Sequence, residues 1–422
     1  MKENLFEYIK SVKSDSSELL DLIKFNISEK VYYYGDHFKI SSPPSKMLFI
    51  LNFLATYIYT RLINYKLRNK SPNKLSGLSA SYHNFDNQME KDGFNNLRMP
   101  HLLKRGKKTI GNSSFFYNTM IIQKSFIYED YNYLISSAFL IKIKNYQRQI
   151  EKLIQQNSYK FLCVSNDNDF FARVYIKAFK KLKKPTFIIA HGGMPSMFDR
   201  IMDNQSDYVT MWGSKQIESF IKAGYDKNKF INTGHPFYNK TPTHLRFELT
   251  SILVITKSIN GVCPLDKPHL EDRGNIIMYL LSIENTLKKM GIKSITLRPH
   301  PSENANWYLK FIDNDFFIID KQPLSASLSS ASLVIGPTST TIIDAMAHEV
   351  NYLIYEPLID NKLITGFPLQ PPLDGSDSRI PIARSEDDLF QFIKEKKRID
   401  ISVYKEFANP NFDITFLKDI IK

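Results

Sequence analysis

From about Lys160 onward, short apolar runs alternate with amphipathic stretches of helical period. Apolar runs of about four to eight residues between turn residues indicate buried strands, and strands that alternate with helices indicate βαβ units around a parallel sheet. The first strands are expected at FLCVSND, PTFIIAHGG, SDYVTMWG and KFINTGHP, with helices at DFFARVYIKAFKKLKK and SKQIESFIKAGY. We expect Ser214 to cap the second helix and Gly224 to end it.

A second series of the same kind follows a polar stretch at 238–249. Its strands are expected at SILVITKS, SITLRPHP, FFIID, SLVIGPTSTT and NYLIYEP, and its helices at 275–290 and 339–349. Further on, Ser385 with Asp388 three residues later predicts a helix start before LFQFIKEKK. The two series predict an α/β protein with two Rossmann-like domains that face a central cleft.

The domain boundaries follow from the same two series. An N-terminal, acceptor-side domain is expected over residues 1–240, with basic and apolar helices in the part before residue 150. A C-terminal domain that binds the nucleotide donor is expected over residues 250–392, and the segment 393–422 is expected to pack back on the N-terminal domain. A chain of 422 residues is longer than a single typical core, which supports this division.

Charge and cysteine content limit the compartment and the partners. The formal net charge of +13 favours anionic partners. Cys163 and Cys263 both lie in apolar stretches, which argues against a disulfide framework and fits a reducing compartment. The first twenty residues contain acidic and polar side chains and no continuous apolar region, so a cytoplasmic protein is expected.

The longest apolar run, from Met47 to Thr60, is too short for the roughly 20 residues that span a bilayer. Basic side chains follow it at Arg61, Lys66, Arg68 and Lys70. One interpretation is an interfacial helix that meets anionic lipid at the inner face of the plasma membrane; the other is a buried helix with a solvated basic end. Two further basic clusters lie at Lys104, Arg105, Lys107 and Lys108 and at Lys180, Lys181, Lys183 and Lys184. They lack the pattern of a nucleic-acid binder, so no nucleic acid partner is expected.

Ligands of open α/β sheets bind beyond the carboxyl ends of the strands, so the residues after each predicted strand are the candidates for chemistry. Arg298-Pro299-His300-Pro301 follows the strand SITL. The prolines stiffen this turn, and the His300 imidazole can then donate a hydrogen bond to a phosphate oxygen and stabilise a leaving nucleotide. The alternative is a histidine in a stiff turn. Arg298 and His300 are both predicted to bind the donor.

The loop Gly336-Pro337-Thr338-Ser339-Thr340-Thr341 lies between a predicted strand and a predicted helix. Hydroxyls and free amides at a helix start favour phosphate, whereas plain N-capping accounts for one or two hydroxyls only. Thr338, Ser339, Thr340 and Thr341 are therefore predicted to bind the donor. Lys257 and Ser258, at the end of the first strand of the second series, are predicted to do the same.

Three residues after strands of the first series are candidates for the general base. His191 precedes Gly192-Gly193, where the backbone can approach a ligand closely, and could deprotonate an acceptor hydroxyl. Asp167 and Asp169 offer carboxylates for the same task, although either could simply cap the next helix.

Two weaker candidates lie at the edges of the second domain. His235, in Gly234-His235-Pro236, lies where the first domain meets the linker. Glu356 follows the strand NYLIY, where it could accept hydrogen bonds from a ribose.

The run IIAHGG…SDYVTMWGSKQIESFIKAGYDKNKFINTGHP, then LRPHP and ASLVIGPTSTTIIDAMAHEVNYLIYEP, resembles bacterial GT-B transferases of surface polymers over roughly residues 160–360. The CDP-glycerol glycerophosphotransferases of teichoic acid synthesis and the His-Pro-containing capsule transferases that use CMP-sialic acid or CMP-Kdo are similar in pattern. The sequence departs from both, with His-Gly-Gly in place of Trp-His-Gly-Thr-Pro and Asn-Asp-Asn-Asp in place of an acidic pair followed by Gly.

The resemblance implies a GT-B fold, inverting transfer without a bound metal or cofactor, and a cytidine nucleotide donor in the C-terminal domain. It matches His300 to the histidine that contacts the donor phosphate, Ser339 or Thr340 to the hydroxyl residues, and His191, Asp167 or Asp169 to the base. The expected function is a capsule or cell-surface glycosyltransferase that uses a CMP-linked nonulosonic acid or Kdo-type sugar and a glycan or lipid-linked acceptor. The alternatives are a CDP-glycerol-type polyol-phosphate transferase, a sugar-nucleotide epimerase and a non-catalytic glycan-binding scaffold.

Overall fold

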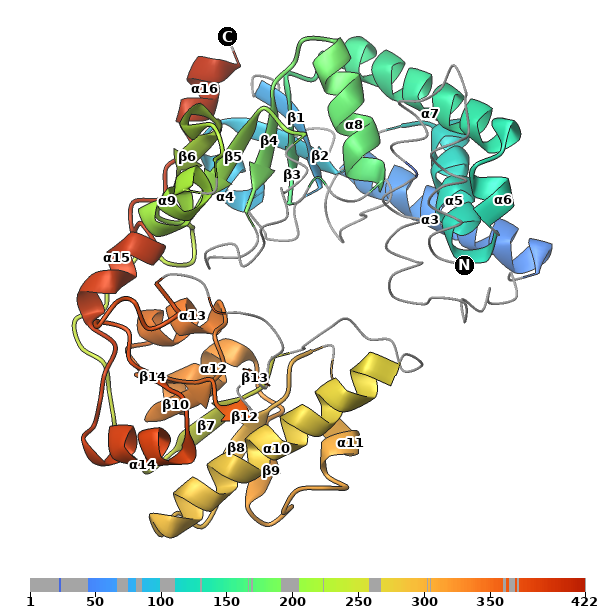
Figure 1. Cartoon of the computed structure of the whole chain (residues 1–422). Coiled ribbons are helices and arrows are strands. Elements are labelled where there is room, and N and C mark those ends of the chain that lie inside the picture. The colour runs from blue at the N-terminus through green and yellow to red at the C-terminus, as the bar shows by residue number, and fades with distance from the viewer. Residues whose placement is uncertain are drawn as a thin grey trace.

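The computed structural model describes most of the chain. The described residues are 23, 45–66, 75–80, 86–98, 111–129, 131–165, 167, 170–190, 205–222, 224–257, 267–301, 303, 305–359, 362–363, 369 and 372–421. They form two lobes, each built around one sheet (Figure 1). The expected α/β architecture with two Rossmann-like sheets, as in a GT-B fold, is confirmed.

The first sheet has six parallel strands in the order β2-β1-β3-β4-β5-β6. Its strands are β1 (Leu75–Ala80), β2 (Phe94–Arg98), β3 (Phe161–Val164), β4 (Thr186–Ile189), β5 (Tyr208–Met211) and β6 (Phe230–Asn232). The helices of this lobe are α3 (Lys46–Lys66), α4 (Asp86–Lys91), α5 (Ser113–Tyr128), α6 (Tyr131–Leu134), α7 (Ser137–Gln156), α8 (Phe170–Lys181) and α9 (Ser214–Lys222). β3, β4, β5 and helix α8 coincide with the sequence pattern, since nearly all of their apolar positions are buried. Helix α9 lies where the pattern predicts it, with Phe220 buried and Ile221 exposed.

The second sheet is also parallel, in the order β14-β11-β10-β7-β8-β9. Its strands are β7 (Ile252–Ile255), β8 (Ile295–Arg298), β9 (Phe317–Ile319), β10 (Leu333–Gly336), β11 (Tyr352–Tyr355) and β14 (Ile382–Ala383). A separate antiparallel pair is formed by β12 (Leu358–Ile359) and β13 (Lys362–Leu363). Counted from β7, this is the 3-2-1-4-5-6 order of a dinucleotide-binding domain, in which the chain changes direction between β7 and β10.

Helices cover both faces of the second sheet. They are α10 (Lys267–Lys289), α11 (Ala305–Tyr308), α12 (Leu324–Ser330), α13 (Thr341–Ala347) and α14 (Glu386–Lys394). Ile252 and Val254 of β7 pack into the core beneath α10, whereas Leu253 and Ile255 belong to the core on the side of α12 and α13. Ser385 caps α14 by accepting a hydrogen bond from the amide of Asp388 at 3.1 Å.

After α14 the chain returns to the first lobe through α15 (Tyr404–Phe407) and α16 (Phe416–Ile420) (Figure 1). The Asn409 amide donates to the Trp212 carbonyl at 2.7 Å, and the Asp413 amide donates to the Thr233 carbonyl at 2.9 Å. Gly234 has φ of +69°, and a Cβ there would lie 2.4 Å from the Asn409 carbonyl oxygen. Only glycine therefore fits beneath this segment.

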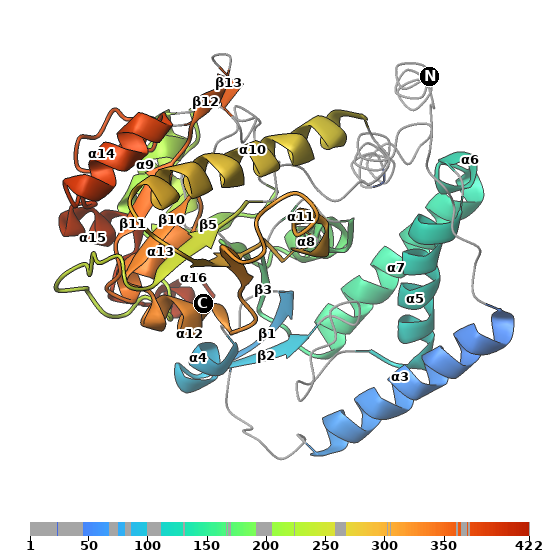
Figure 2. The ribbon, with the colours of Figure 1, turned by 90° about the horizontal axis from the view of Figure 1, so that it is seen from below.

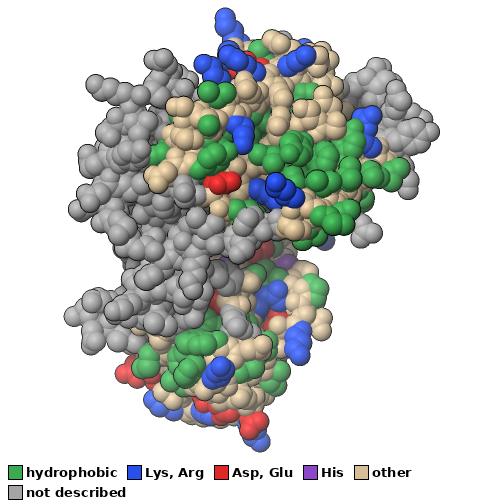
Figure 3. Space-filling view, turned by 90° about the vertical axis from the view of Figure 1, so that its right-hand side faces the viewer, with side chains coloured by type: hydrophobic (Ala, Val, Ile, Leu, Met, Phe, Trp, Pro, Cys, Tyr) green, Lys and Arg blue, Asp and Glu red, His purple; other side chains and the backbone are tan. Residues whose placement is uncertain are grey.

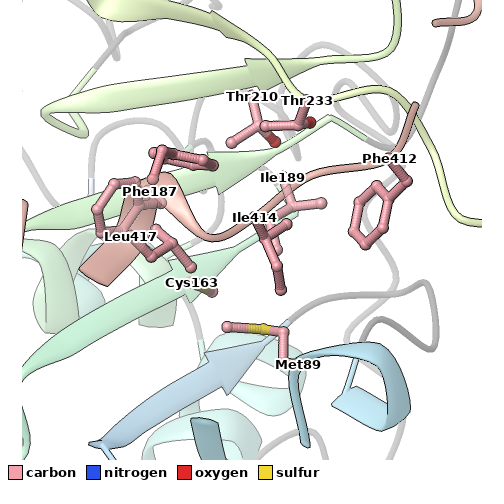
Figure 4. A pocket seen from close by; sticks show the side chains of 10 residues that line it. Met89, Cys163, Phe187, Ile189, Thr210, Thr233, Phe412, Ile414 and Leu417 are labelled. Carbon is pink, nitrogen blue, oxygen red and sulfur yellow. The ribbon is translucent and has the colours of Figure 1, made fainter. Parts of the chain in front are cut away.

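Residues 412–421 cover one face of the first sheet. Ile414, Leu417 and Ile421 share a core with Phe161 and Phe187, and Figure 4 shows side chains of this segment and of the strands that point toward one another. The space left among them is about 10 Å³, the size of a single water. This is a closed core and has no room for a sugar or a nucleotide.

Candidate functional site

The switch point of the second sheet concentrates most of the predicted donor residues. β7 lies between β8 and β10, so Lys257, His300 and Ser339 follow three adjacent parallel strands at one edge of the sheet. Adjacent strands are about 4.8 Å apart, so the ends of β8 and β10 are about 10 Å apart. The crevice beyond such an edge, at the reversal of strand order, is where doubly wound sheets bind ligands.

The backbone of His300 is held in place and its side chain is exposed. Its amide donates to the carboxylate of Glu303 at 2.7 Å and is 3.1 Å from the Thr256 hydroxyl, which itself donates to the same carboxylate. The Glu303 amide donates to the His300 carbonyl at 2.8 Å and closes the turn. The two flanking prolines and these bonds fix the backbone from which the His300 ring projects.

Arg298 lies on the other side of the same turn. Its guanidinium donates to the Asp320 carboxylate at 2.6 Å and to the Gln322 carbonyl at 2.7 Å, and the Asp320 carboxylate also accepts from the Ser327 hydroxyl at 2.6 Å. These bonds tie β8 to the end of β9 and to α12. The observed role of Arg298 is therefore structural, and its contact with donor phosphate stays a prediction.

The loop after β10 is anchored by a buried carboxylate. The amide and the hydroxyl of Thr338 both donate to the fully buried Glu356 at 2.7 Å. Tyr352 donates to the Pro337 carbonyl at 2.6 Å, and a Cβ on Gly336 would lie 2.3 Å from the Tyr352 hydroxyl. Glu356 thus orders the loop from within the core, and its contact with a ribose stays a prediction.

The remaining hydroxyls of this loop are half-buried at the start of α13. The Ser339 hydroxyl accepts from the Thr341 amide at 3.0 Å and donates to the Thr341 hydroxyl at 2.9 Å. Thr340 has helical backbone angles, and its side chain makes no capping hydrogen bond. The loop is thus fixed in shape, with the Thr340 hydroxyl not used as a cap.

Lys257 places a cation at the end of β7. Burial lowers the pKa of its amine, and the nearby Glu356 carboxylate partly offsets this effect. The Lys257 amine and the Glu356 carboxylate thus interact through their charges, and Glu356 is the acid that anchors the loop. A half-buried cation beside a fixed loop can neutralise a phosphate more strongly than a fully solvated one.

Asp167 is the base candidate that the structure describes. It is fully buried, and its carboxylate accepts from the amides of Gln205 at 2.6 Å and Ser206 at 3.3 Å. Burial raises its pKa, opposed by these two amides and by Arg173. These contacts anchor the residues before β5. Asp169, His191 with its two glycines, and Ser258 lie outside the described residues.

The weaker candidate His235 belongs to the core. Its ring lies between Trp212 and Tyr238, at centroid distances of 4.4 and 4.7 Å, and its Nδ1 accepts from the Phe237 amide at 3.1 Å. It is fully buried, so it packs the junction between the lobes. Nearby, the Tyr238 hydroxyl donates to Asp344 of α13 at 2.8 Å, which joins the linker to the second lobe.

Sequence reasoning missed Thr256 and Glu303. Both lie at the ends of predicted strand segments, but neither a hydroxyl after a strand nor a glutamate three residues after a histidine forms a recognised motif. The feature that could have pointed to Glu303 was the tight turn at His300, which the Glu303 amide closes. Within the described part of the chain, no group of three or more His, Cys, Asp or Glu side chains is placed to hold a metal ion.

Solved structures of two UDP-GlcNAc 2-epimerases and of MurG match most of this chain. The UDP-GlcNAc 2-epimerase of Methanocaldococcus jannaschii, in complex with UDP-GlcNAc and UDP, matches at a TM-score of 0.48 and 12% identity over 82% of this chain and 99% of that one. The UDP-GlcNAc 2-epimerase of Neisseria meningitidis bound to UDP-GlcNAc matches at 0.45 and 11%, over 82% and 98%. MurG of Acinetobacter baumannii matches at 0.42 and 11%, over 82% and 98%.

No protein-family model matches the chain, and no curated protein matches it either. None of the three structures is a glycerophosphotransferase or a capsule transferase by its description, so they add nothing to the resemblance drawn from the motifs. At these identities and TM-scores the likeness carries no conclusion about the reaction, which has to follow from the residues of the site.

Proposed function

We propose that this protein is an enzyme that binds a nucleotide-activated donor at the β7–β10 edge and transfers its activated group to an acceptor hydroxyl. The observation that carries the proposal is the alignment of Lys257, the exposed His300 and the Thr338–Thr341 loop at the switch point of a parallel sheet. The Lys257 amine, the His300 imidazole and the loop then surround one anionic group. A nucleoside phosphate fits this arrangement.

Each residue has a role in this proposal. The Lys257 amine neutralises the phosphate, and the loop at the start of α13 receives it through the Thr340 hydroxyl and nearby amides. The His300 ring donates a hydrogen bond to the phosphate oxygen on which negative charge grows as its bond to the transferred group breaks. A CMP-linked nonulosonic acid or Kdo-type sugar is the proposed donor, with CDP-glycerol as the alternative.

The acceptor is a glycan or a lipid-linked glycan, and its hydroxyl loses a proton as it attacks the donor. Asp167 is poorly placed to take this proton, because its carboxylate is fully buried and accepts two backbone amides. We therefore assign Asp167 to positioning the chain before β5. Asp169 or His191 remains as the base.

A second candidate function follows from Glu303. Epimerisation of the donor sugar would require two groups that exchange protons, and Glu303, whose carboxylate accepts from the His300 backbone amide, is a second acid–base group next to the turn that carries the imidazole. Such an enzyme would convert the donor without any acceptor. In the present geometry the Oε2 atom of Glu303 is engaged by the His300 amide and the Thr256 hydroxyl, so we place transfer first.

Two measurements test the proposal. Melting temperatures with CMP, CDP, UDP, GDP and dTDP identify the nucleotide, since a ligand of the folded state alone raises stability. Donors carrying that nucleotide are then incubated with and without glycan acceptors, and products are separated by mass spectrometry. Nucleotide release that requires an acceptor supports transfer, and an isomerised donor without acceptor supports epimerisation.

His300→Ala is the diagnostic variant, and His244→Ala is its matched control, because His244 is an exposed histidine of the linker. We expect a loss of activity of about 100-fold or more for the first variant and none for the second. Both should melt like the wild type. Full activity of His300→Ala would overturn the role assigned to this residue. Absence of any nucleotide effect on melting, together with no nucleotide release from any donor, would overturn the proposed function and leave a non-catalytic glycan-binding protein.

A further inference from the structure

Helix α3 is apolar on two opposite faces. Its inner face packs on α5 through aromatic rings, with Phe53 and Tyr117 at 5.5 Å and Tyr57 and Phe116 at 6.2 Å between centroids. Phe49 is nearly fully buried in the same layer. A surface helix of a globular protein normally buries one such face and exposes a polar one.

The outer face of α3 is aliphatic instead. Its members recur at the spacing of one helical stripe and are between 44% and 71% exposed; they are Met47, Ile50, Leu51, Leu54, Ile58 and Leu62. From the first to the last, the stripe covers about 22 Å at 1.5 Å per residue. Figure 3 shows a broad hydrophobic area on this side of the upper lobe, with Lys and Arg side chains around it. A contiguous apolar area of this kind marks an interaction surface.

The charged side chains of this helical layer are almost all positive. Helices α3, α5 and α7 together contain eight Lys or Arg residues and a single acidic residue, Glu151. The Glu151 carboxylate is paired with Lys181 of α8 at 2.8 Å. Lys46 and Arg61 are exposed near the two ends of the aliphatic stripe. The layer is thus both apolar and strongly basic.

We infer that the outer face of α3 docks on the surface of an anionic lipid bilayer, with the helix lying along it. Aliphatic side chains enter the boundary of the acyl chains while Lys46 and Arg61 meet the headgroups. A second copy of the chain fits less well, because a two-fold interface would place the same basic layers against each other. No described helix is long and apolar enough to cross a membrane, which fits a helix at the interface.

This inference does not depend on the reaction at the β7–β10 edge. A chain without transferase activity would still bind vesicles, and a chain that does not bind vesicles could still be a transferase. The two proposals therefore fail separately.

Sedimentation of the full chain with vesicles provides the test. The probes are vesicles of phosphatidylcholine alone and vesicles of phosphatidylcholine mixed with phosphatidylglycerol. We expect binding to the anionic vesicles only, weakened by salt because headgroup attraction is screened. Equal binding to both, or binding to neither, would overturn the inference.

The diagnostic variant combines Leu51→Gln, Leu54→Gln and Ile58→Gln, all at exposed positions of the stripe. The matched control combines Phe237→Gln, Met278→Gln and Ile318→Gln, which are exposed apolar residues outside α3. We expect the first variant to bind anionic vesicles about tenfold more weakly or worse, and the control to bind like the wild type. Circular dichroism melting shows that both are folded.

Arg61→Glu tests the contribution of charge apart from that of the apolar contact. It should weaken binding to the anionic vesicles. Light scattering without vesicles tests whether a second copy of the chain, in place of lipid, occupies the stripe. A dimer of the wild type that the Leu51, Leu54 and Ile58 variant abolishes would assign the stripe to a second copy and overturn the inference. Unchanged vesicle binding by that variant would do the same.

Discussion

The backbone amide of His300 donates a hydrogen bond to the carboxylate of Glu303 at 2.7 Å, and the Thr256 hydroxyl donates to the same carboxylate. One acid thereby joins the ends of two neighbouring strands, β7 and β8. The contact fixes the backbone from which the exposed ring of His300 projects. Glu303 is a positioning residue, since it acts on the substrate only through the turn that carries His300.

Removal of this acid should lower turnover more than substrate affinity. A hydrogen bond to a charged group contributes about 1.5–3 kcal/mol, which is about 10- to 100-fold in rate if it is lost only in the transition state. We expect Glu303→Ala to lower kcat by that factor with little change in KM. Glu303→Gln keeps an acceptor oxygen and should recover part of the loss. Equal kcat for the alanine variant and the wild type in steady-state assays would exclude the role.

A second prediction concerns the loop after β10. Thr338→Val removes the hydroxyl but keeps the amide, so the buried Glu356 carboxylate loses one of its two donors from this residue. An incompletely satisfied buried carboxylate costs about 1–3 kcal/mol. We expect a lower free energy of unfolding in urea and weaker nucleotide binding. The exposed Thr243, which pairs with Glu349 at the surface, offers Thr243→Val as a control with a smaller effect.

A third prediction is a pH dependence of donor binding. Burial holds the pKa of Lys257 below the ordinary lysine value, and the protonated amine is the form that attracts phosphate. Nucleotide affinity should therefore fall as the pH rises through this lowered pKa. Lys257→Arg keeps its charge at all these pH values, so its affinity should stay level between about pH 7 and about pH 10. Calorimetric titration across this range measures both, and parallel curves would contradict the prediction.

The returning C-terminal segment carries a fourth prediction. Arg379 donates to Glu406 of α15 and also to Asp377. The hydrogen bond from Arg379, opposed by burial and by the Asp377 charge, holds the pKa of the Glu406 carboxyl below its usual value. A carboxyl with a lowered pKa in the folded state stabilises it fully above the unfolded value and loses that effect as the pH falls through the folded one. Both side chains are about one-third exposed, so solvent screening weakens the pair.

Protection factors of residues 398–421, which correct for the slower intrinsic exchange of amides in acid, should therefore fall on acidification below about pH 4.5. Glu406→Gln should lower the same protection factors at neutral pH. Glu395→Gln, at an exposed position on the end of α14, should not. Protection factors that are independent of pH and unchanged in Glu406→Gln would show that the ion pair does not hold the segment, and would leave the packing of Ile414 and Leu417 to hold it.

Strands β3, β4, β7, β10 and β11 could be predicted because each is a short apolar run whose side chains are buried on both faces of a parallel sheet. β1 could not, since LSGLSA has few large apolar residues. The structure gives the reason at Gly77, where a Cβ would lie 2.3 Å from the Phe161 ring. A strand that accepts a neighbouring ring needs small residues and loses its sequence signal.

The sequence predicted where in the fold the candidate residues lie. It did not predict the hydrogen bonds among them. Strand ends identified Lys257, His300 and the hydroxyl loop, because the carboxyl edge of a parallel sheet collects such residues. The same rule placed Glu356 and Arg298 toward a ligand, whereas the structure turns both to internal partners, Thr338 and Asp320. Local sequence cannot show which of several acceptors and donors at one edge will satisfy each other.

The return of the chain to the first lobe has a consequence for biosynthesis. Ile414, Leu417 and Ile421 complete the core over Phe161 and Phe187, which are made some 250 residues earlier in the chain. A ribosome that has finished the first sheet leaves this apolar face bare while the whole second lobe is translated. During that interval the face is exposed to aggregation, and it is covered only when α16 emerges.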